Sequence, residues 1–395
     1  MAHTSHFVTA RRSRWVSATL IACGLACALQ GNAQIPREDS GYIPVDNINT
    51  LPGQSGYINR EGRFILRQLF ESAGKFSENL AAVKFAGSKW GYIDTTGKMV
   101  IMPEYDEAGE FSEGVAAVNV GGKWGYINKA GKLVIPARFD DAEQFSDGQA
   151  IVRLGEATGH IDKRGKIITK PRPDWFLWKF SNGMARVEVY GEQGTILGFI
   201  ATTGRVAIKP QYHRAGDFSE GLAPVATGGE WHSTTGDWRG VKYGYVDKTG
   251  KAVIPFRFDY AGEFLEGIAP VVIDGAGGFI DKAGRVVIEP QFHSVRQFSE
   301  GLAPVQLAWR GKYGYIDRAG RIAIRPEWQD VGNFSGGLAP VHVGGGKYGY
   351  IDQTGKMVIE AQFNKASEFA DGLAVVTFFY PRGLIDGSGR WKGFR

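Results

Sequence analysis

Short runs of alternating apolar and polar residues, separated by turns that contain glycine, fill the chain from residue 56 onward. In the run 313–317 (YGYID), Tyr313 and Tyr315 share one face of an extended strand, because successive side chains point to opposite faces. Residues 317–320 have the composition of a type I turn that ends in a left-handed glycine, and the apolar run 321–324 follows. With the apolar run that precedes them, these segments predict a three-stranded meander, joined to the next by a connection that contains a helical turn.

This meander recurs along the chain. A string of Gly, an apolar residue or His, Ile or Val, three further residues, Gly, and Lys or Arg occurs ten times. Its first glycines are Gly56, Gly91, Gly125, Gly159, Gly198, Gly244, Gly278, Gly314, Gly349 and Gly383. A second string, Phe-Ser-x-Gly-Leu-Ala-x-Val with small variations, occurs nine times between them. Turn geometry explains the Asp, Asn and Gly of the first string, and we expect the phenylalanines of the second to form a buried spine.

The strands that begin the first string carry a further motif. It reads Lys-Trp-Gly-Tyr-Ile at 89–93 and 123–127, and Lys-Tyr-Gly-Tyr-Ile/Val at 242–246, 312–316 and 347–351. These motifs, with their flanking strings, resemble the WG-repeat (KWG-repeat) proteins from Gly56 to about Arg390. The resemblance implies a tandem β repeat, and no single activity follows from it. Four copies have Thr158, Leu197, Gly277 or Arg382 in place of the aromatic residue, and these units should pack less well.

One three-stranded unit cannot bury a stable core, so neighbouring units must stack. We expect an all-β tandem array of about ten such units, open and solenoid-like, with residues 34–55 as an N-terminal cap or linker and 56–395 as the repeat domain. A closed β-propeller is the alternative. Propellers usually have about four to eight blades of four strands, which ten three-stranded units fit poorly, and the final unit looks complete rather than split between the termini.

The first 33 residues have the order of a signal peptide. Three arginines within residues 11–14 precede an apolar stretch, and small residues precede an expected cleavage after Ala33. The sequence around Cys23 resembles a lipoprotein box, so a lipid anchor at Cys23 is the minor alternative. We therefore expect an exported protein, located in the periplasm, in the outer envelope or outside the cell, with no transmembrane segment after signal removal.

The composition and motifs of the chain exclude several classes of functional site and partner. Both cysteines, Cys23 and Cys27, lie in the expected signal peptide, so the mature chain has no disulfide and no thiolate site. The formal charge is +5, and loss of the three signal arginines leaves +2, which is too nearly neutral for a nucleic-acid partner. No metalloprotease, serine-hydrolase, P-loop or dinucleotide motif is present. His213 and His293 share a repeat position with Asp, Gln and Asn, which indicates a turn or capping role. We expect neither metal nor cofactor.

Two segments break the repeat, and we interpret them as the candidate ligand-binding site. The longest insertion, residues 226–241 (ATGGEWHSTTGDWRGV), carries Trp231, His232, Asp237 and Trp238. The second irregular segment, residues 171–178 (PRPDWFLW), carries Trp175 and Trp178. Insertions in repeat proteins map to loops and often to a binding face, and aromatic side chains on loops suit sugar rings or peptide chains. The alternative is that these tryptophans fill a mismatch between units.

Taken together, the sequence favours an exported, non-enzymatic repeat scaffold that binds a polymer or a protein: a glycan, a component of the cell envelope or a partner protein. One alternative is an envelope enzyme, such as a glycan hydrolase, that draws its carboxylates from the irregular loops. The other is a purely structural assembly subunit.

Overall fold

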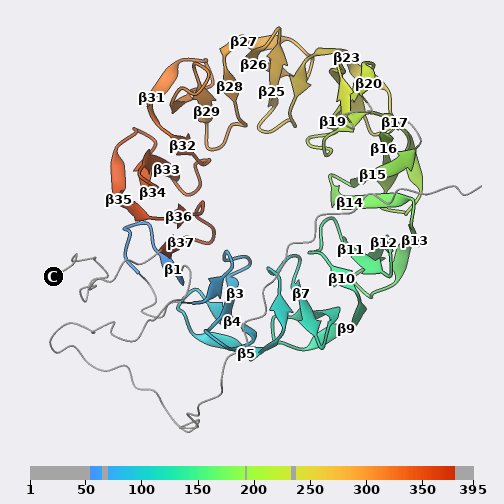
Figure 1. Cartoon of the computed structure of the whole chain (residues 1–395), viewed down its shortest axis with the longest axis vertical. Helices are drawn as coiled ribbons and strands as arrows, with labels where there is room; N and C mark the ends of the chain where they lie inside the picture. Colours follow the sequence, from blue (N-terminus) through green and yellow to red (C-terminus); the bar gives the residue numbers. More distant parts are fainter. Residues whose placement is uncertain (1–53, 65–69, 192–193, 233–236, 379–395) are drawn as a thin grey trace, which may run out of the picture. The chain divides into compact units, whose positions relative to one another are not determined.

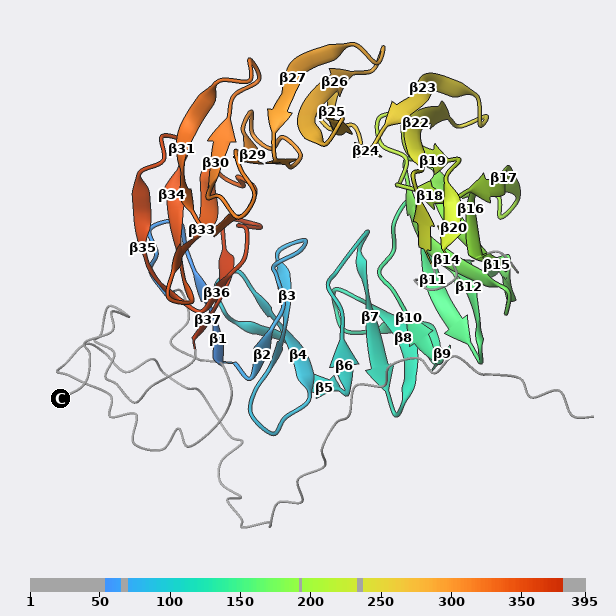
Figure 2. The ribbon, with the colours of Figure 1, turned by 45° about the horizontal axis from the view of Figure 1, so that its top comes forward.

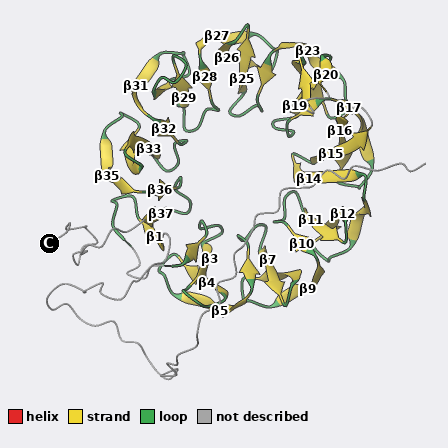
Figure 3. Cartoon of the chain, viewed as in Figure 1, coloured by secondary structure: helices red, strands yellow, loops and turns green. Residues whose placement is uncertain are grey.

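The computed structural model describes residues 54–64, 70–191, 194–232 and 237–378. Strands and turns account for this part of the chain, which contains no helix and hence none able to cross a membrane (Figure 3). The strands form small antiparallel sheets that stand side by side as the blades of a ring (Figure 1). In each blade the strands follow one another from the inside of the ring to its outside.

Eight blades have four strands each, and a ninth has three named strands. The innermost strands are β2 (Ser72–Ala73), β6 (Glu107–Ala108), β10 (Asp141–Ala142), β14 (Trp175–Ser181), β18 (Arg214–Ala215), β24 (Tyr260–Ala261), β28 (Ser294–Val295), β32 (Asp330–Val331) and β36 (Lys365–Ala366). The second strands are β3 (Leu80–Lys84), β7 (Val115–Val120), β11 (Gln149–Leu154), β15 (Met184–Gly191), β19 (Leu222–Thr227), β25 (Ile268–Ile273), β29 (Ala303–Gln306), β33 (Leu338–Gly344) and β37 (Ala374–Phe378).

The third strands carry the WG motif or its variants. They are β4 (Trp90–Asp94), β8 (Lys123–Asn128), β12 (Ala157–Asp162), β16 (Gly194–Ala201), β22 (Lys242–Asp247), β26 (Ala276–Asp281), β30 (Tyr313–Ile316), β34 (Lys347–Asp352) and β1 (Gln54–Ile58). The outermost strands are β5 (Met99–Tyr105), β9 (Leu133–Phe139), β13 (Ile167–Arg172), β17 (Val206–Tyr212), β23 (Ala252–Phe258), β27 (Val286–Phe292), β31 (Ile322–Trp328) and β35 (Met357–Phe363). An extra hairpin, β20 (Glu230–His232) with β21 (Asp237–Arg239), interrupts the fifth blade.

The molecule is therefore a closed β-propeller, and the expected open array of three-stranded units is wrong. The error has a physical source in the innermost strands, most of which have two residues and show no periodicity. The connection expected to hold a helical turn is instead a tight hairpin in which Ser77 and Leu80 exchange both backbone hydrogen bonds. Glu78 and Asn79, at its tip, have φ of 54° and 67°, as a type I′ turn requires.

The first and last described repeats share one blade, and this blade closes the ring. The expectation that the final unit is complete by itself is therefore wrong. Strand β1 of the first repeat pairs with β37 of the last, with Gly56 opposite Val376 (Figure 2). Isolated bridges from Ser55 to Phe70 and from Ile58 to Phe64 stand where the other blades pair their third and fourth strands. The tenth copy of the hairpin string, at Gly383, lies outside the described residues. Nine copies build the part of the ring that the structure describes.

The Lys-Trp-Gly-Tyr motif is mainly structural. A Cβ atom at Gly91 would lie 2.6 Å from the carbonyl oxygen of Ile101 on β5, so only glycine permits this close approach. The next residue, Tyr92, is fully buried, and its hydroxyl donates a 2.8 Å hydrogen bond to the Gly109 carbonyl of the next blade. Lys89 forms a 3.1 Å ion pair with Asp106, again in the next blade. Where the motif is present, it thus joins a blade to its successor.

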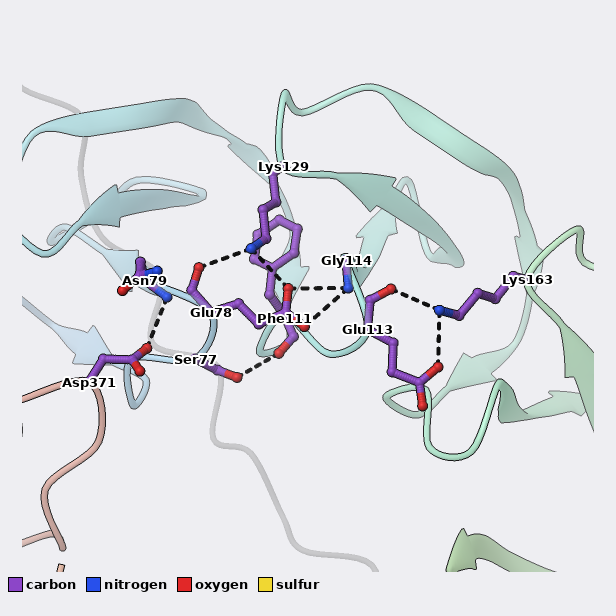
Figure 4. Close-up of polar contacts among 9 residues, drawn as sticks. All are labelled: Ser77, Glu78, Asn79, Phe111, Glu113, Gly114, Lys129, Lys163 and Asp371. Atoms are coloured by element: carbon purple, nitrogen blue, oxygen red, sulfur yellow. Dashed lines mark hydrogen bonds and ion pairs between the residues drawn. The ribbon is translucent and has the colours of Figure 1, made fainter. Parts of the chain in front are cut away.

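The second repeated string holds the opposite ends of the blades together. The expected phenylalanine spine is confirmed, since all nine phenylalanines from Phe76 to Phe369 are buried. A serine follows seven of these nine phenylalanines, and its hydroxyl bonds to the next blade: Ser77 Oγ donates to the Phe111 carbonyl at 2.7 Å (Figure 4). Glu78 accepts a 3.1 Å hydrogen bond from the backbone N–H of Gly114 and pairs with Lys129 at 3.0 Å. These contacts recur around most of the ring.

The Asp-x-x-Gly turns join blades as well as strands. Asp94 Oδ1 accepts hydrogen bonds from the backbone N–H groups of Thr96 and Lys98, which confirms the predicted capping role. The turn glycine Gly320 has a φ of 77°. A Cβ atom there would lie 2.9 Å from Cγ2 of Ile288 in the preceding blade. Glycine is therefore required both by the left-handed backbone and by the packing between blades.

Candidate functional site

A cavity of about 680 Å³ opens at the end of the blades where the second strand turns into the third. Its lining comes from five consecutive blades, those of β14–β17, β18–β23, β24–β27, β28–β31 and β32–β35. Aromatic residues in the lining are Trp178, Trp238, Tyr243 and Tyr260, and charged residues are Arg186, Glu188, Arg214, Glu263 and Arg296. Five blades therefore share one cavity.

Trp178 brings the first irregular segment into this cavity. It lies on β14, and the Arg186 guanidinium stacks 4.2 Å above its ring. Arg186 is fixed in turn by Asp217, at 2.7 Å, and by the Ala215 carbonyl, at 3.0 Å. The indole Nε1 of Trp178 is buried and has no hydrogen-bond partner within the described part of the chain.

The insertion contributes Trp238. In the hairpin β20–β21, Trp231 pairs with Trp238 and His232 with Asp237 along the backbone. The Trp238 ring stacks on His213 with centroids 3.6 Å apart and planes 5° from parallel. His213 Nδ1 makes a 2.8 Å hydrogen bond with the Gly228 carbonyl, which agrees with the capping role expected for this repeat position. The side chains of Trp231 and Asp237 lie outside the described atoms.

The structure thus brings together two of the six candidate residues, Trp178 and Trp238, from different blades. Trp175 is placed elsewhere: it is half-buried beneath Arg172, whose guanidinium lies 4.5 Å from the ring centroid. His232 is half-buried and is not part of the cavity lining.

Sequence reasoning missed most of the lining, although one signal was available. We define the F−2 position as the residue two places before the buried phenylalanine of each repeat. Glycine occupies it in five repeats, as Gly74, Gly109, Gly216, Gly262 and Gly332. The other four repeats have Glu143, Trp178, Arg296 and Ser367. Trp178 and Arg296 therefore add large side chains where the fold accepts glycine, and both line the cavity.

The charges of the cavity are largely neutralised within it. Arg186 pairs with Asp217, and Arg296 pairs with Asp330 at 2.8 Å while lying 4.6 Å over the Tyr313 ring. Burial raises the pKa of the Glu263 carboxyl, which also accepts a 2.9 Å hydrogen bond from the backbone N–H of Asp217. The described residues contain no cluster of His, Cys, Asp and Glu suited to a metal ion.

Comparisons with known proteins agree with this architecture. A family model described as WG containing repeat matches nine consecutive segments. They are residues 56–89, 90–124, 124–156, 159–192, 198–231, 243–275, 278–308, 313–347 and 348–378. No match is found among curated proteins.

Similarity to solved structures concerns the fold alone. A structure titled as the eukaryotic initiation factor is 12% identical, with a TM-score of 0.55 over 83% of this chain and 98% of that one. BamB from Moraxella catarrhalis is 10% identical, with a TM-score of 0.39 over 78% of this chain and 96% of that one. The nine matched segments extend from the closing strand β1 to the end of β37 and account for the nine blades. The chain belongs to the WG containing repeat family.

Proposed function

We propose that this chain is an exported, non-enzymatic binding scaffold whose ligand occupies the cavity lined by Trp178 and Trp238. The observation that carries the proposal is the convergence of the two breaks in the repeat on one cavity. A repeat needs neither break for its own packing, because the other blades close without them. The participation of five blades favours an extended ligand, either a polymer or a segment of a partner.

The geometry supports binding over seam filling. Trp178 replaces a residue that is glycine in five other repeats, so the blade does not need its volume. The ring is nevertheless held firmly by Arg186, which is itself held by Asp217. Trp238 is held in the same way, by His213. Aromatic rings fixed in this manner bind a ligand at low entropic cost, because little freedom remains to be lost.

The geometry also favours a scaffold over an enzyme. Glu263 is the carboxyl in the cavity with a raised pKa, but it caps the backbone N–H of Asp217 in the preceding blade. Glu368 does the same for Asn333 at the joint between the last two blades. Glu263 and Glu368 occupy the same repeat position and make the same capping contact. This contact explains the presence of a carboxyl at that position without a catalytic role. Export is supported by the order of residues 1–33, which lie outside the described residues.

Trp178→Gly tests the proposal, because glycine restores the residue common at the F−2 position. We expect Tm to change by less than about 2 °C and ligand binding on glycan and peptide arrays to be lost. Trp309→Ala is the matched control, since Trp309 is 74% exposed and lies outside the cavity lining. Full binding by Trp178→Gly, or a fall of Tm that shows the tryptophan to be structural, contradicts the proposal. Release of new sugar ends by the wild-type protein would indicate the hydrolase alternative instead.

A further inference from the structure

A second cavity, of about 420 Å³, is formed by the blades of β2–β5, β6–β9 and β10–β13. Two tryptophans, Trp90 and Trp124, and three glutamates, Glu107, Glu110 and Glu143, line it. The remaining lining residues are alanine, glycine and glutamine, and none is lysine or arginine. No irregular segment contributes to this cavity, so it lies within the regular repeat.

The two cavities are built from the same repeat positions. Trp90 and Trp124 precede the first glycine of their strings, as Tyr243 does in the other cavity. Glu143 and Trp178 both occupy the F−2 position, and they belong to consecutive blades, those of β10–β13 and β14–β17. The cavities therefore open on the same face of the ring and end in neighbouring blades.

We propose that the second cavity is a further subsite for the same ligand, and that this ligand is a glycan chain without acidic groups. The inference rests on the proposed function of the first cavity. Together the two cavities draw on eight consecutive blades, from β2–β5 to β32–β35, which is the arrangement that a chain following one face of the ring would use.

The charges and the aromatic rings define the ligand class. Three carboxyl groups with no cation in the lining repel nucleic acids, uronates and other anionic polymers. Partial desolvation and the nearby Asp141 raise the pKa of the Glu143 carboxyl, while Lys179 opposes them. Carboxylates accept hydrogen bonds from sugar hydroxyls, and the C–H faces of a sugar ring pack against indole. In the first cavity Arg186 and Arg296 are already paired, so that cavity also offers little for an acidic ligand.

A peptide chain fits the second cavity less well. Extended peptides usually bind by adding a strand to an exposed sheet edge, through a ladder of main-chain hydrogen bonds. The inner edge strands at the second cavity, β6 and β10, have two residues each and are too short for such a ladder.

The experiment measures the affinity of the full chain for oligosaccharides of increasing length. The probes are neutral oligoglucans and chito-oligosaccharides, deacetylated chito-oligosaccharides, and oligouronates. The variant Trp90→Leu uses a residue found naturally at the same position, Leu197, and Glu143→Gly restores the common glycine of the F−2 position. Both should therefore fold, which a thermal melt verifies.

We expect short neutral or basic oligosaccharides to bind the wild type and both variants equally, through the first cavity. Long ones should bind the wild type more tightly, because the binding free energies of linked subsites add. Each variant should lose that gain, by about tenfold. Trp178→Gly should weaken binding at every length. Oligouronates should not bind.

Each failure has a distinct pattern. If Trp90→Leu and Glu143→Gly leave the affinity for long chains unchanged, the second subsite is wrong while the first cavity stands. If peptides or oligouronates bind and neutral and basic glycans do not, the ligand class is wrong. If Trp178→Gly binds every probe as the wild type does, the proposed function itself fails.

Discussion

At the scale of single residues, the repeat explains side chains that would otherwise look catalytic. His160 occupies the position where six other blades have a buried tyrosine, as Tyr92 is in the first. Its Nε2 lies 3.0 Å from the Trp178 carbonyl, the same kind of acceptor that each tyrosine hydroxyl uses in the next blade. Its Nδ1 lies 3.1 Å from Thr169 Oγ1, where neighbouring blades have isoleucine. His160 is therefore a core residue that replaces tyrosine.

Because His160 is buried, we expect the free energy of unfolding to decrease in acid. Burial lowers its pKa from 6.5 to about 4, so the unfolded chain binds a proton more readily than the folded chain between these values. Stability is thus unaffected above pH 6.5 and falls as pH drops from there to about 4. We expect this residue to remove on the order of 2 kcal/mol between pH 7 and pH 4.5.

Urea unfolding of the wild type and of His160→Phe at the two pH values measures this effect. Phenylalanine occurs at the same position, as Phe199 and Phe279, so the variant should fold. It should be less stable at pH 7, because the Trp178 carbonyl loses its donor, but its stability should fall less on acidification. Equal pH dependence in the two proteins would show that His160 is accessible to protons in the folded state.

At the scale of the structural element, the alternation of apolar and polar residues predicted only those strands that are long enough to show it. The second, third and fourth strands of each blade have mostly five to eight residues and were predicted. The innermost strand has two residues in eight blades, so no alternation could reveal it. The Ser-Glu-Gly-Leu hairpin was hidden for a related reason, because it places glutamate at positive φ, which sequence statistics disfavour. The contacts of that glutamate with the next blade compensate for the strain.

The serine of this hairpin gives a paired prediction. Ser112 Oγ donates a 2.7 Å hydrogen bond to the Phe145 carbonyl across a blade joint, and Ser112→Ala should cost about 1 kcal/mol. Leu265 occupies the serine position in another blade, where it is 40% exposed. Leu265→Ser should stabilise the protein by up to about 1 kcal/mol, because the Phe298 carbonyl gains a donor and an exposed apolar side chain is removed. Denaturant titration of both variants tests this, and destabilisation by both would contradict the proposed role of the serine.

At the scale of the whole molecule, the sequence identified the repeat but could not decide how it closes. Closure depends on the rotation between neighbouring blades, and that rotation is set by contacts such as Gly320 against Ile288, which link residues of different repeats. The candidate site likewise contains residues that the sequence identified and residues that only the closed ring brings together. Trp178 and Trp238 stood out because they break the pattern, whereas Tyr243 and Glu263 occupy regular positions and acquire their place in the cavity only through the ring.

The closed ring makes a prediction that an open array does not. Ser55 on β1 lies opposite Thr377 on β37, with their hydroxyl oxygens 3.4 Å apart. In a chain that carries Cys23→Ser and Cys27→Ser, the pair Ser55→Cys and Thr377→Cys should form an intramolecular disulfide on oxidation. The bond closes a loop of more than 300 residues, and it should stabilise the fold by about 2–4 kcal/mol. Non-reducing electrophoresis and melts with and without dithiothreitol measure both effects.

The control pairs Ser55→Cys with Val343→Cys, because Val343 is exposed on β33 of the neighbouring blade and does not pair with β1. It should give free thiols or disulfide-linked dimers without stabilisation. If the Ser55 and Thr377 pair behaves in the same way, the termini do not meet within one chain and the ring is open. If the monomeric disulfide forms and its melting temperature falls on reduction, the first and last repeats share one blade, and the propeller is closed by the strand that sequence reasoning assigned to the beginning of an open array.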